Sequence, residues 1–117
     1  MNNLAGPIDM EEVMEILDGD KELLIECFDE ILNSMPQTLA EIQSAIEQGD
    51  ASSLDKAAHK LKGSLKYIAA AHAADVACQL ETMGKDNRLE SAYDIFRNLY
   101  YECEKVTDFM GRYKAGI

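Results

Sequence analysis

One histidine of this chain is expected on the polar side of a helix, with lysines on both sides of it. It lies in the stretch Ala58–Ser64, which reads AHKLKGS. At about 100° per residue, His59 lies about 140° from the centre of the apolar stripe of that helix. We therefore expect its imidazole to face solvent. The stripe itself repeats at intervals of three and four, as in a helix that faces a core: Leu54, Ala58, Leu61, Leu65 and Ile68.

The lysines near His59 suit an anionic group such as phosphate. Lys62 and Lys56, three residues after and before it, are best spaced to stabilise the charge of about −2 that a phosphoryl group adds. A lone histidine on a helix surface is usually only a solvated residue. Here the chain has a formal net charge of −11, yet no acid occurs between residues 56 and 74, which favours a specific role.

Gly63 lies one turn after His59. A glycine inside a helix costs about 1 kcal/mol relative to alanine, so we expect it to leave room for the imidazole ring or for an approaching protein. Four further residues of this segment are candidate contacts for that protein: Lys60, Lys66, Ser52 and Asp55.

A single exposed imidazole can act as a nucleophile toward an activated phosphoryl group. A histidine side chain is largely neutral near pH 7 and keeps a lone pair on one ring nitrogen. The phosphoramidate that forms is labile and suited to passing the group on. The other histidine, His72, lies among alanines between two expected helices, and we interpret it as a structural or capping residue.

Composition and motifs exclude several classes of function. The 117 residues suffice for one domain, 1–117, and the acidic charge argues against nucleic-acid binding. No hydrolase, nucleotide-binding or metalloprotease motif occurs, so we expect neither autonomous kinase activity nor a cofactor.

Three widely spaced cysteines, Cys27, Cys78 and Cys103, form no C-x-x-C pair, which favours reduced thiols in the cytoplasm and no metal site. Residues 1–7 lack the charged region and apolar run of a signal peptide, and no segment approaches 18 consecutive apolar residues, so we expect neither a signal peptide nor a membrane-spanning segment.

The hydrophobic pattern predicts an all-α fold with bundle helices at about 20–48, 51–69, 71–83 and 87–114. Asp9 is expected to cap a short extra helix that ends near Leu17, Asp20 to cap the first bundle helix, and Asp50 or Ser52 to cap the second. Pro36 should kink or split the first bundle helix, and the unbroken stripe favours a kink. Gly84 is the expected terminator of the third bundle helix. Asn87 and Glu90 can form a capping box for the last one. Short connections predict an antiparallel up-down-up-down four-helix bundle, with the N-terminal helix covering one end.

The segment His59-Lys60-Leu61-Lys62-Gly63-Ser64, followed by Ile68-Ala69-Ala70 and Cys78-Gln79-Leu80-Glu81, resembles the histidine-containing phosphotransfer (HPt) domain. The family pattern is roughly H-x-L-K-G-S, then an aliphatic-Gly-Ala step, then a leucine-glutamate pair. The resemblance implies a four-helix bundle in which His59 carries the phosphoryl group, Lys62 assists and Gly63 gives clearance. The chain departs from the pattern at Ala69, a mild change in helix packing, and at Lys60 and Lys66-Tyr67, which bear on partner choice.

The resemblance implies a cytoplasmic phosphorelay carrier in two-component signalling. His59 would accept a phosphoryl group from a receiver-domain aspartate and pass it to another, with response-regulator receivers or a hybrid sensor histidine kinase as partners. Magnesium is expected on the partner receiver. Two alternatives stay open, a non-catalytic helical docking module for a receiver or kinase, and the detached phospho-accepting domain of a larger histidine kinase. The initial Met and the short tail after the last helix favour a free-standing protein.

Overall fold

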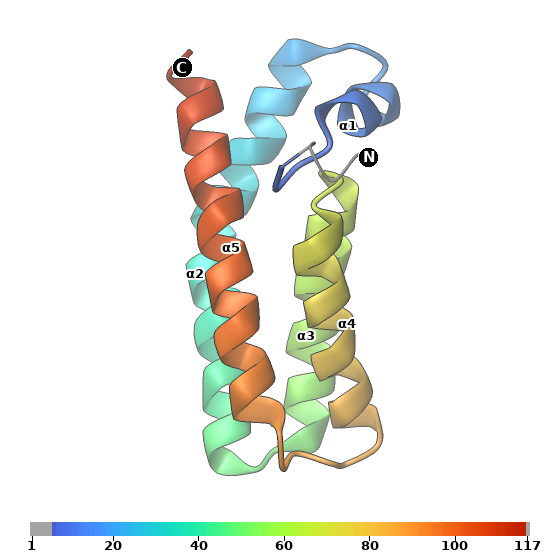
Figure 1. Cartoon of the computed structure of the whole chain (residues 1–117), viewed down its shortest axis with the longest axis vertical. Helices are drawn as coiled ribbons and strands as arrows, with labels where there is room; N and C mark the ends of the chain where they lie inside the picture. Colours follow the sequence, from blue (N-terminus) through green and yellow to red (C-terminus); the bar gives the residue numbers. More distant parts are fainter. Residues whose placement is uncertain (1–5, 117) are drawn as a thin grey trace.

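The computed structural model describes residues 6–116, and over that range it is helical without any strand. Five helices follow one another along the chain (Figure 1): α1 Met10–Ile16, α2 Lys21–Gln48, α3 Ala51–Tyr67, α4 Ala71–Lys85 and α5 Ala92–Lys114. The four long helices alternate in direction, and short connections join them. The predicted all-α antiparallel bundle is confirmed.

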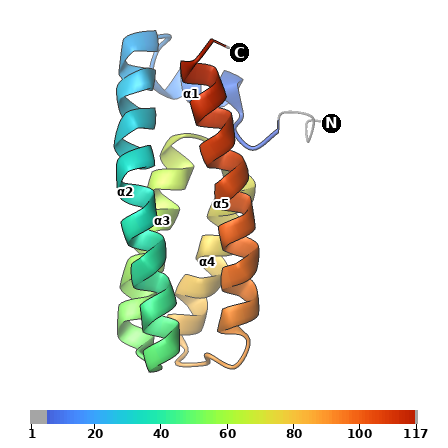
Figure 2. The ribbon, with the colours of Figure 1, turned by 90° about the vertical axis from the view of Figure 1, so that its left-hand side faces the viewer.

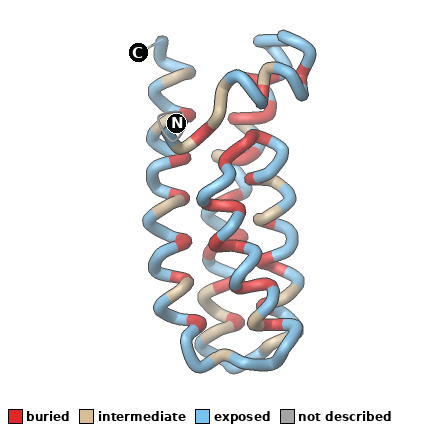
Figure 3. Tube along the Cα trace, turned by 45° about the vertical axis from the view of Figure 1, so that its right-hand side comes forward, coloured by how far each residue is buried: buried red, intermediate tan, exposed pale blue. Residues whose placement is uncertain are grey.

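The bundle consists of two pairs of helices. Figures 1 and 2 show α2 and α5 side by side on one side, with α3 and α4 on the other. The short α1 lies across the end of the bundle where α3 passes into α4, and the side chains of Ile8, Val13 and Leu17 join the common core. In Figure 3 the buried residues of the long helices face the interior. The α2–α3 and α4–α5 connections are mostly exposed, whereas residues 68–70 between α3 and α4 are buried.

Three aspartates cap helix N-termini as the sequence suggests. The carboxylate of Asp9 accepts a hydrogen bond from the backbone N–H of Glu12, and Asp20 accepts one from Leu23. Asp50, rather than the alternative cap Ser52, starts α3 by accepting from the N–H of Ser53 at 3.1 Å. Each cap satisfies a donor that a helix start leaves unpaired. The residues on which α1, α2 and α3 begin are therefore set by local chemistry.

Two predicted helix boundaries are wrong. Gly84 does not end α4, because the helix continues to Lys85 and Gly84 is buried within it. The last helix begins at Ala92 rather than near residue 87, and its start has no side-chain cap, so the capping box of Asn87 and Glu90 does not form. Asn87 instead adopts a left-handed backbone with φ of 54° in the connection.

Two further positions clarify the path of the chain. Helix α2 is not split at Pro36, which lies inside one helix of 28 residues. Helix α3 ends at Tyr67, two residues before the expected end, and Ala69 takes a left-handed φ of 58°. A left-handed residue is where glycine is favoured, so the backbone conformation explains why the family pattern has glycine here. The change to alanine affects the backbone rather than helix packing.

Candidate functional site

The imidazole of His59 projects from α3 toward solvent and is held at one ring nitrogen. Its side chain is 68% exposed, and Nδ1 lies 2.6 Å from Oε2 of Glu81 on α4. The exposure agrees with the helical phase, which places His59 opposite the buried Leu54, Leu61 and Leu65. One edge of the ring is therefore fixed by the protein while the other faces outward.

Glu81 is the buried acid of this site. Only 4% of the residue is exposed, although a carboxylate is rarely buried without partners. Lys62 donates from Nζ to Oε1 at 2.5 Å. The hydrogen bond from Lys62, and then the one shared with His59, hold the pKa of Glu81 at about 2, against an ordinary value of 4.5. Glu81 is thus ionised at neutral pH.

The ionised Glu81 determines which nitrogen of His59 is free. A carboxylate can only accept hydrogen bonds, so Nδ1 must carry the proton that it shares with Glu81. In the neutral ring the lone pair then lies on Nε2. Because Nδ1 contacts Glu81 on α4 and the side chain is largely exposed, the lone pair of the neutral ring is left on the nitrogen that is not held by the carboxylate.

A second lysine extends the network along α4. Nζ of Lys85 lies 3.1 Å from Oδ1 of Asp55 and 3.5 Å from Oε2 of Glu81. These contacts raise the pKa of Lys85, with the hydrogen bond to Asp55 as the largest cause, and the hydrogen bond to Glu81 raises the pKa of Lys62. Both lysines are therefore charged, and the carboxylates of two helices are neutralised beside the imidazole.

Gly84 sets the distance between α3 and α4 at this point. A Cβ added at Gly84 would lie 2.6 Å from the backbone nitrogen of Asp55 and 2.8 Å from the carbonyl oxygen of Ala51. Such distances are much shorter than van der Waals contact, so only glycine permits this approach. Glu81 is one turn before Gly84 on α4, and His59 is one turn after Asp55 on α3. The close approach therefore brings the carboxylate within reach of the imidazole.

Comparison with known proteins identifies the family. The family model described as "Hpt domain" matches residues 26–111. The chain belongs to the Hpt domain family.

Two solved structures share the fold. The histidine-containing phosphotransfer protein B (HptB) of Pseudomonas aeruginosa PAO1 has a TM-score of 0.88 at 18% identity. The HPT domain of the Hpt sensor hybrid histidine kinase from Shewanella has a TM-score of 0.84 at 20% identity. In both cases the match covers 95% of this chain and 96% of the other. No curated protein matches the chain. Hpt domains are phosphocarriers of two-component phosphorelays, and they interact with receiver domains and histidine kinases.

A hollow lies beside His59 on the side toward α2. It measures about 510 Å³ and is bounded by eight residues of this Hpt domain: Cys27, Glu30 and Ile31 of α2, and His59, Lys60, Gly63, Ser64 and Tyr67 of α3. A Cβ at Gly63 would meet no atom within 4 Å. An alanine there would therefore not crowd the imidazole, which leaves an approaching protein as the better reason for this glycine.

The other predicted site residues are distributed around the network. Asp55 belongs to it through Lys85, and Lys60 borders the hollow. Lys56 borders a different hollow, between α2 and α3 near Asp50. Ser52 and Lys66 are exposed on α3. Lys56, Lys60 and Lys66 take part in none of the ion pairs found among residues 6–116.

Sequence reasoning assigned no role to Glu81, and the signal for one, its burial among apolar positions, comes from the structure. Along α4 the buried positions are mostly small or apolar, and Glu81 is the one acid among them: Ala73, Ala74, Val76, Ala77, Leu80, Glu81 and Gly84. A buried carboxylate requires a partner, so this position pointed to a cation or an imidazole on a neighbouring helix. His72, by contrast, is exposed at the start of α4, where no side chain caps the helix.

Two negative findings complete the description. Within residues 6–116 no group of three or more histidine, cysteine or acidic side chains is arranged to hold a metal ion. Among the same residues, no helix is long and apolar enough to cross a membrane.

Proposed function

We propose that this Hpt domain is a phosphorelay carrier that accepts a phosphoryl group on Nε2 of His59 from a receiver-domain aspartate and passes it to another. The observation that carries the proposal is the contact of 2.6 Å between Nδ1 and the ionised Glu81. It keeps the proton on Nδ1 and leaves the lone pair of Nε2 directed away from the protein.

The transfer needs no further group from this chain. Nε2 attacks the phosphorus of the aspartyl phosphate, the Nε2–P bond forms, and the bond from phosphorus to the aspartyl oxygen breaks to release the carboxylate. The phosphorylated ring keeps its Nδ1 proton and gains positive charge, which Glu81 stabilises through the hydrogen bond. Transfer to a second receiver reverses these bond changes. Magnesium belongs to the receiver, where carboxylates hold it near the phosphoryl group.

The cations around His59 have two different roles. Lys62 is tied to Glu81, so it acts by fixing the carboxylate that orients the ring, and it adds positive potential. Lys60 and Lys66 are exposed and face the carboxylate-rich surface of a receiver. Lys56 lies farther along α3 and contributes at longer range, where salt screens its charge.

The receiver docks over the hollow between α2 and α3. Ile31 and the half-exposed ring of Tyr67 supply apolar contact, and Gly63 lets the receiver backbone approach the imidazole. Ser52 and Asp55 do not line this hollow, so their contact with the receiver stays a prediction. The interface is small and transient, as a carrier that must release each partner requires. We place this exchange in the cytoplasm, where the three cysteines, all free in the structure, stay reduced.

The test is incubation of the purified chain with a panel of phosphorylated receiver domains in magnesium buffer. We expect acid-labile label on the chain, and loss of that label in His59→Gln, which removes the nucleophile from an exposed position and leaves the core unchanged. His72→Gln is the matched control and should be labelled normally. Label that persists in His59→Gln, or that is lost in His72→Gln, would contradict the assignment.

A second measurement separates a carrier from a kinase. The chain should not become labelled from ATP and magnesium alone, and it should be labelled once a phosphorylated receiver or a histidine kinase is added. Efficient labelling by ATP alone would refute the carrier proposal. Tight binding of receivers without any label would favour the docking module instead.

A further inference from the structure

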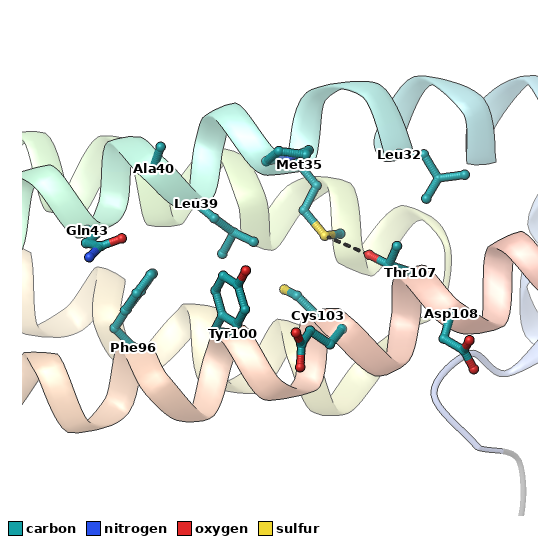
Figure 4. A pocket seen from close by; sticks show the side chains of 12 residues that line it. Leu32, Met35, Leu39, Ala40, Gln43, Phe96, Tyr100, Cys103, Thr107 and Asp108 are labelled. Atoms are coloured by element: carbon teal, nitrogen blue, oxygen red, sulfur yellow. Dashed lines mark hydrogen bonds between the residues drawn. The ribbon is translucent and has the colours of Figure 1, made fainter.

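Helices α2 and α5 leave an apolar groove between them on the side of the bundle that faces the viewer in Figure 2. The groove has a volume of about 640 Å³. Its floor consists of side chains that also belong to the core: Met35, Leu39, Phe96 and Cys103. Figure 4 shows side chains of both helices pointing into this space.

The walls of the groove are apolar and accessible. Pro36 and Ala40 are exposed on the α2 wall. The ring of Tyr100 stands on the α5 wall and is 48% exposed. Below them the hydroxyl of Thr107 donates to the sulfur of Met35 at 3.6 Å, a contact that joins the two helices across the floor (Figure 4). An exposed aromatic ring above an apolar floor is typical of protein interfaces.

The polar groups of the groove are mainly acceptors. Among its twelve lining residues two are acidic, Glu104 and Asp108, and none is basic. Pro36 has no N–H to donate to the carbonyl of Leu32 one turn earlier, so that carbonyl loses its usual helical partner on the same wall. The groove therefore offers negative charge and an acceptor beside an apolar surface, which a partner with cationic donors complements.

We propose that the α2–α5 groove is a docking site for an amphipathic helix of another protein, with an apolar face and lysine or arginine along one flank. The α2 wall extends over residues 32–43, which is roughly 16 Å, or three helical turns. A helix of that length covers the floor, and its basic flank meets Glu104 and Asp108. A second copy of this chain would instead bring another charge of −11 to the same surface.

This groove is separate from the His59 site. It shares no lining residue with the hollow beside His59, and α3 and α4 do not contribute to it. A partner held in the groove therefore leaves the imidazole accessible to a receiver. The proposal does not depend on the chemistry of His59, and the groove can keep a partner near the carrier while successive receivers exchange.

The test uses a designed, capped 14-residue helical peptide with leucine and phenylalanine on one face and lysines beside it. The peptide is titrated into the 15N-labelled full chain and followed by amide chemical shifts. We expect saturable shifts in α2 and α5 around the groove, with His59 and its neighbours unchanged. The reference peptide has the same charge, with serine in place of the apolar residues, and should bind at least about tenfold more weakly, since it keeps only the screened charge attraction.

Matched variants locate the binding. Ala40→Arg fills the groove and should weaken binding by about tenfold or more, because it removes access to the apolar floor. Gln37→Arg adds the same side chain to an exposed position of α2 outside the groove and should have little effect. Glu104→Lys should weaken binding about 3- to 10-fold, whereas Asp75→Lys, with the same charge change on α4, should not.

Three results would overturn the proposal. Equal binding of the serine peptide would mean that the acidic chain attracts any basic peptide. Shifts confined to α3 and α4 would place the site elsewhere. Sedimentation of the chain alone as a dimer that Ala40→Arg dissociates would assign the groove to a second copy rather than to a foreign helix.

Discussion

The contact between Glu81 and His59 leads to a pH-dependent prediction for Glu81→Gln. The carboxylate has a pKa of about 2 in the folded protein and an ordinary value of 4.5. Its ionised form is thus favoured by folding. The stability that it contributes is fully present above about pH 5 and is lost as the pH falls toward 2. Glutamine keeps the shape of the side chain but cannot titrate, so the variant lacks this dependence.

The magnitude follows from the same pKa values. A difference of about 2.5 pKa units corresponds to an upper limit of about 3 kcal/mol. The side chains of Lys62, the main cause of the lowered pKa, and of His59 are 20% and 68% exposed, so water shares both interactions. We therefore expect about 1–2 kcal/mol for Glu81→Gln at pH 7. The loss should shrink between pH 5 and pH 3 and approach zero near pH 2. Urea unfolding of both proteins at several pH values measures it.

The same variant should alter the imidazole. A glutamine amide can either donate or accept, so it no longer requires the proton on Nδ1, and 15N shifts of the His59 ring should reveal a mixture of tautomers. We expect phosphoryl acceptance to become roughly 5- to 30-fold slower, the range that a separate loss of about 1–2 kcal/mol in transition-state stabilisation would give. Glu90→Gln, at an exposed position between α4 and α5, is the control for both measurements. Parallel stability curves for wild type and Glu81→Gln, with an unchanged Nδ1-protonated ring, would refute the reasoning.

Three further substitutions test the geometry around this contact. Gly63→Ala should raise the free energy of unfolding by about 0.5–1 kcal/mol, because its Cβ enters open space in a helix interior; urea unfolding at pH 7 tests the sign. Gly84→Ala should lower that free energy by roughly 1–3 kcal/mol, because its Cβ collides with the backbone of α3, and equal effects of the two glycine variants would contradict this account. Lys62→Ala should slow transfer from a phosphorylated receiver by roughly 3- to 10-fold without blocking receiver binding, measured as initial rates; an unchanged rate would show that Lys62 does not act through Glu81.

The sequence was sufficient to predict what depends on local chemistry. The spacing of Leu54, Leu61 and Leu65 placed His59 on the exposed side of α3, and Asp9 and Asp20 act as the N-caps expected of them. These features need only a helical period and one side-chain acceptor. The bundle follows because four such stripes must bury one another.

Features that depend on two helices were not predictable in this way. Glu81 is 22 residues from His59 in the sequence, and Lys62 was expected to face a phosphoryl group, whereas in the structure it donates to Glu81. The positive φ of Ala69 is set by the tight passage from α3 to α4, where the carbonyl of Ala69 also accepts from the N–H of Asp9. Nothing in the local pattern of residues shows which side chains meet across an interface.

Gly84 shows how a local rule can identify the right residue and the wrong role. A glycine near the end of an apolar stripe usually terminates a helix, yet here it lies inside α4 because α3 passes too close for any side chain. Glycine lowers the stability of a helix by about 1 kcal/mol relative to alanine, and the close packing of α3 against α4 at Gly84 offsets that loss. That approach brings the Glu81 carboxylate to 2.6 Å from Nδ1 of His59 and excludes water from most of the carboxylate. A buried, ionised acceptor at Nδ1 selects the tautomer of the neutral ring in which the lone pair lies on Nε2. The reactivity proposed for His59 therefore depends on Gly84, a residue that has no functional group of its own.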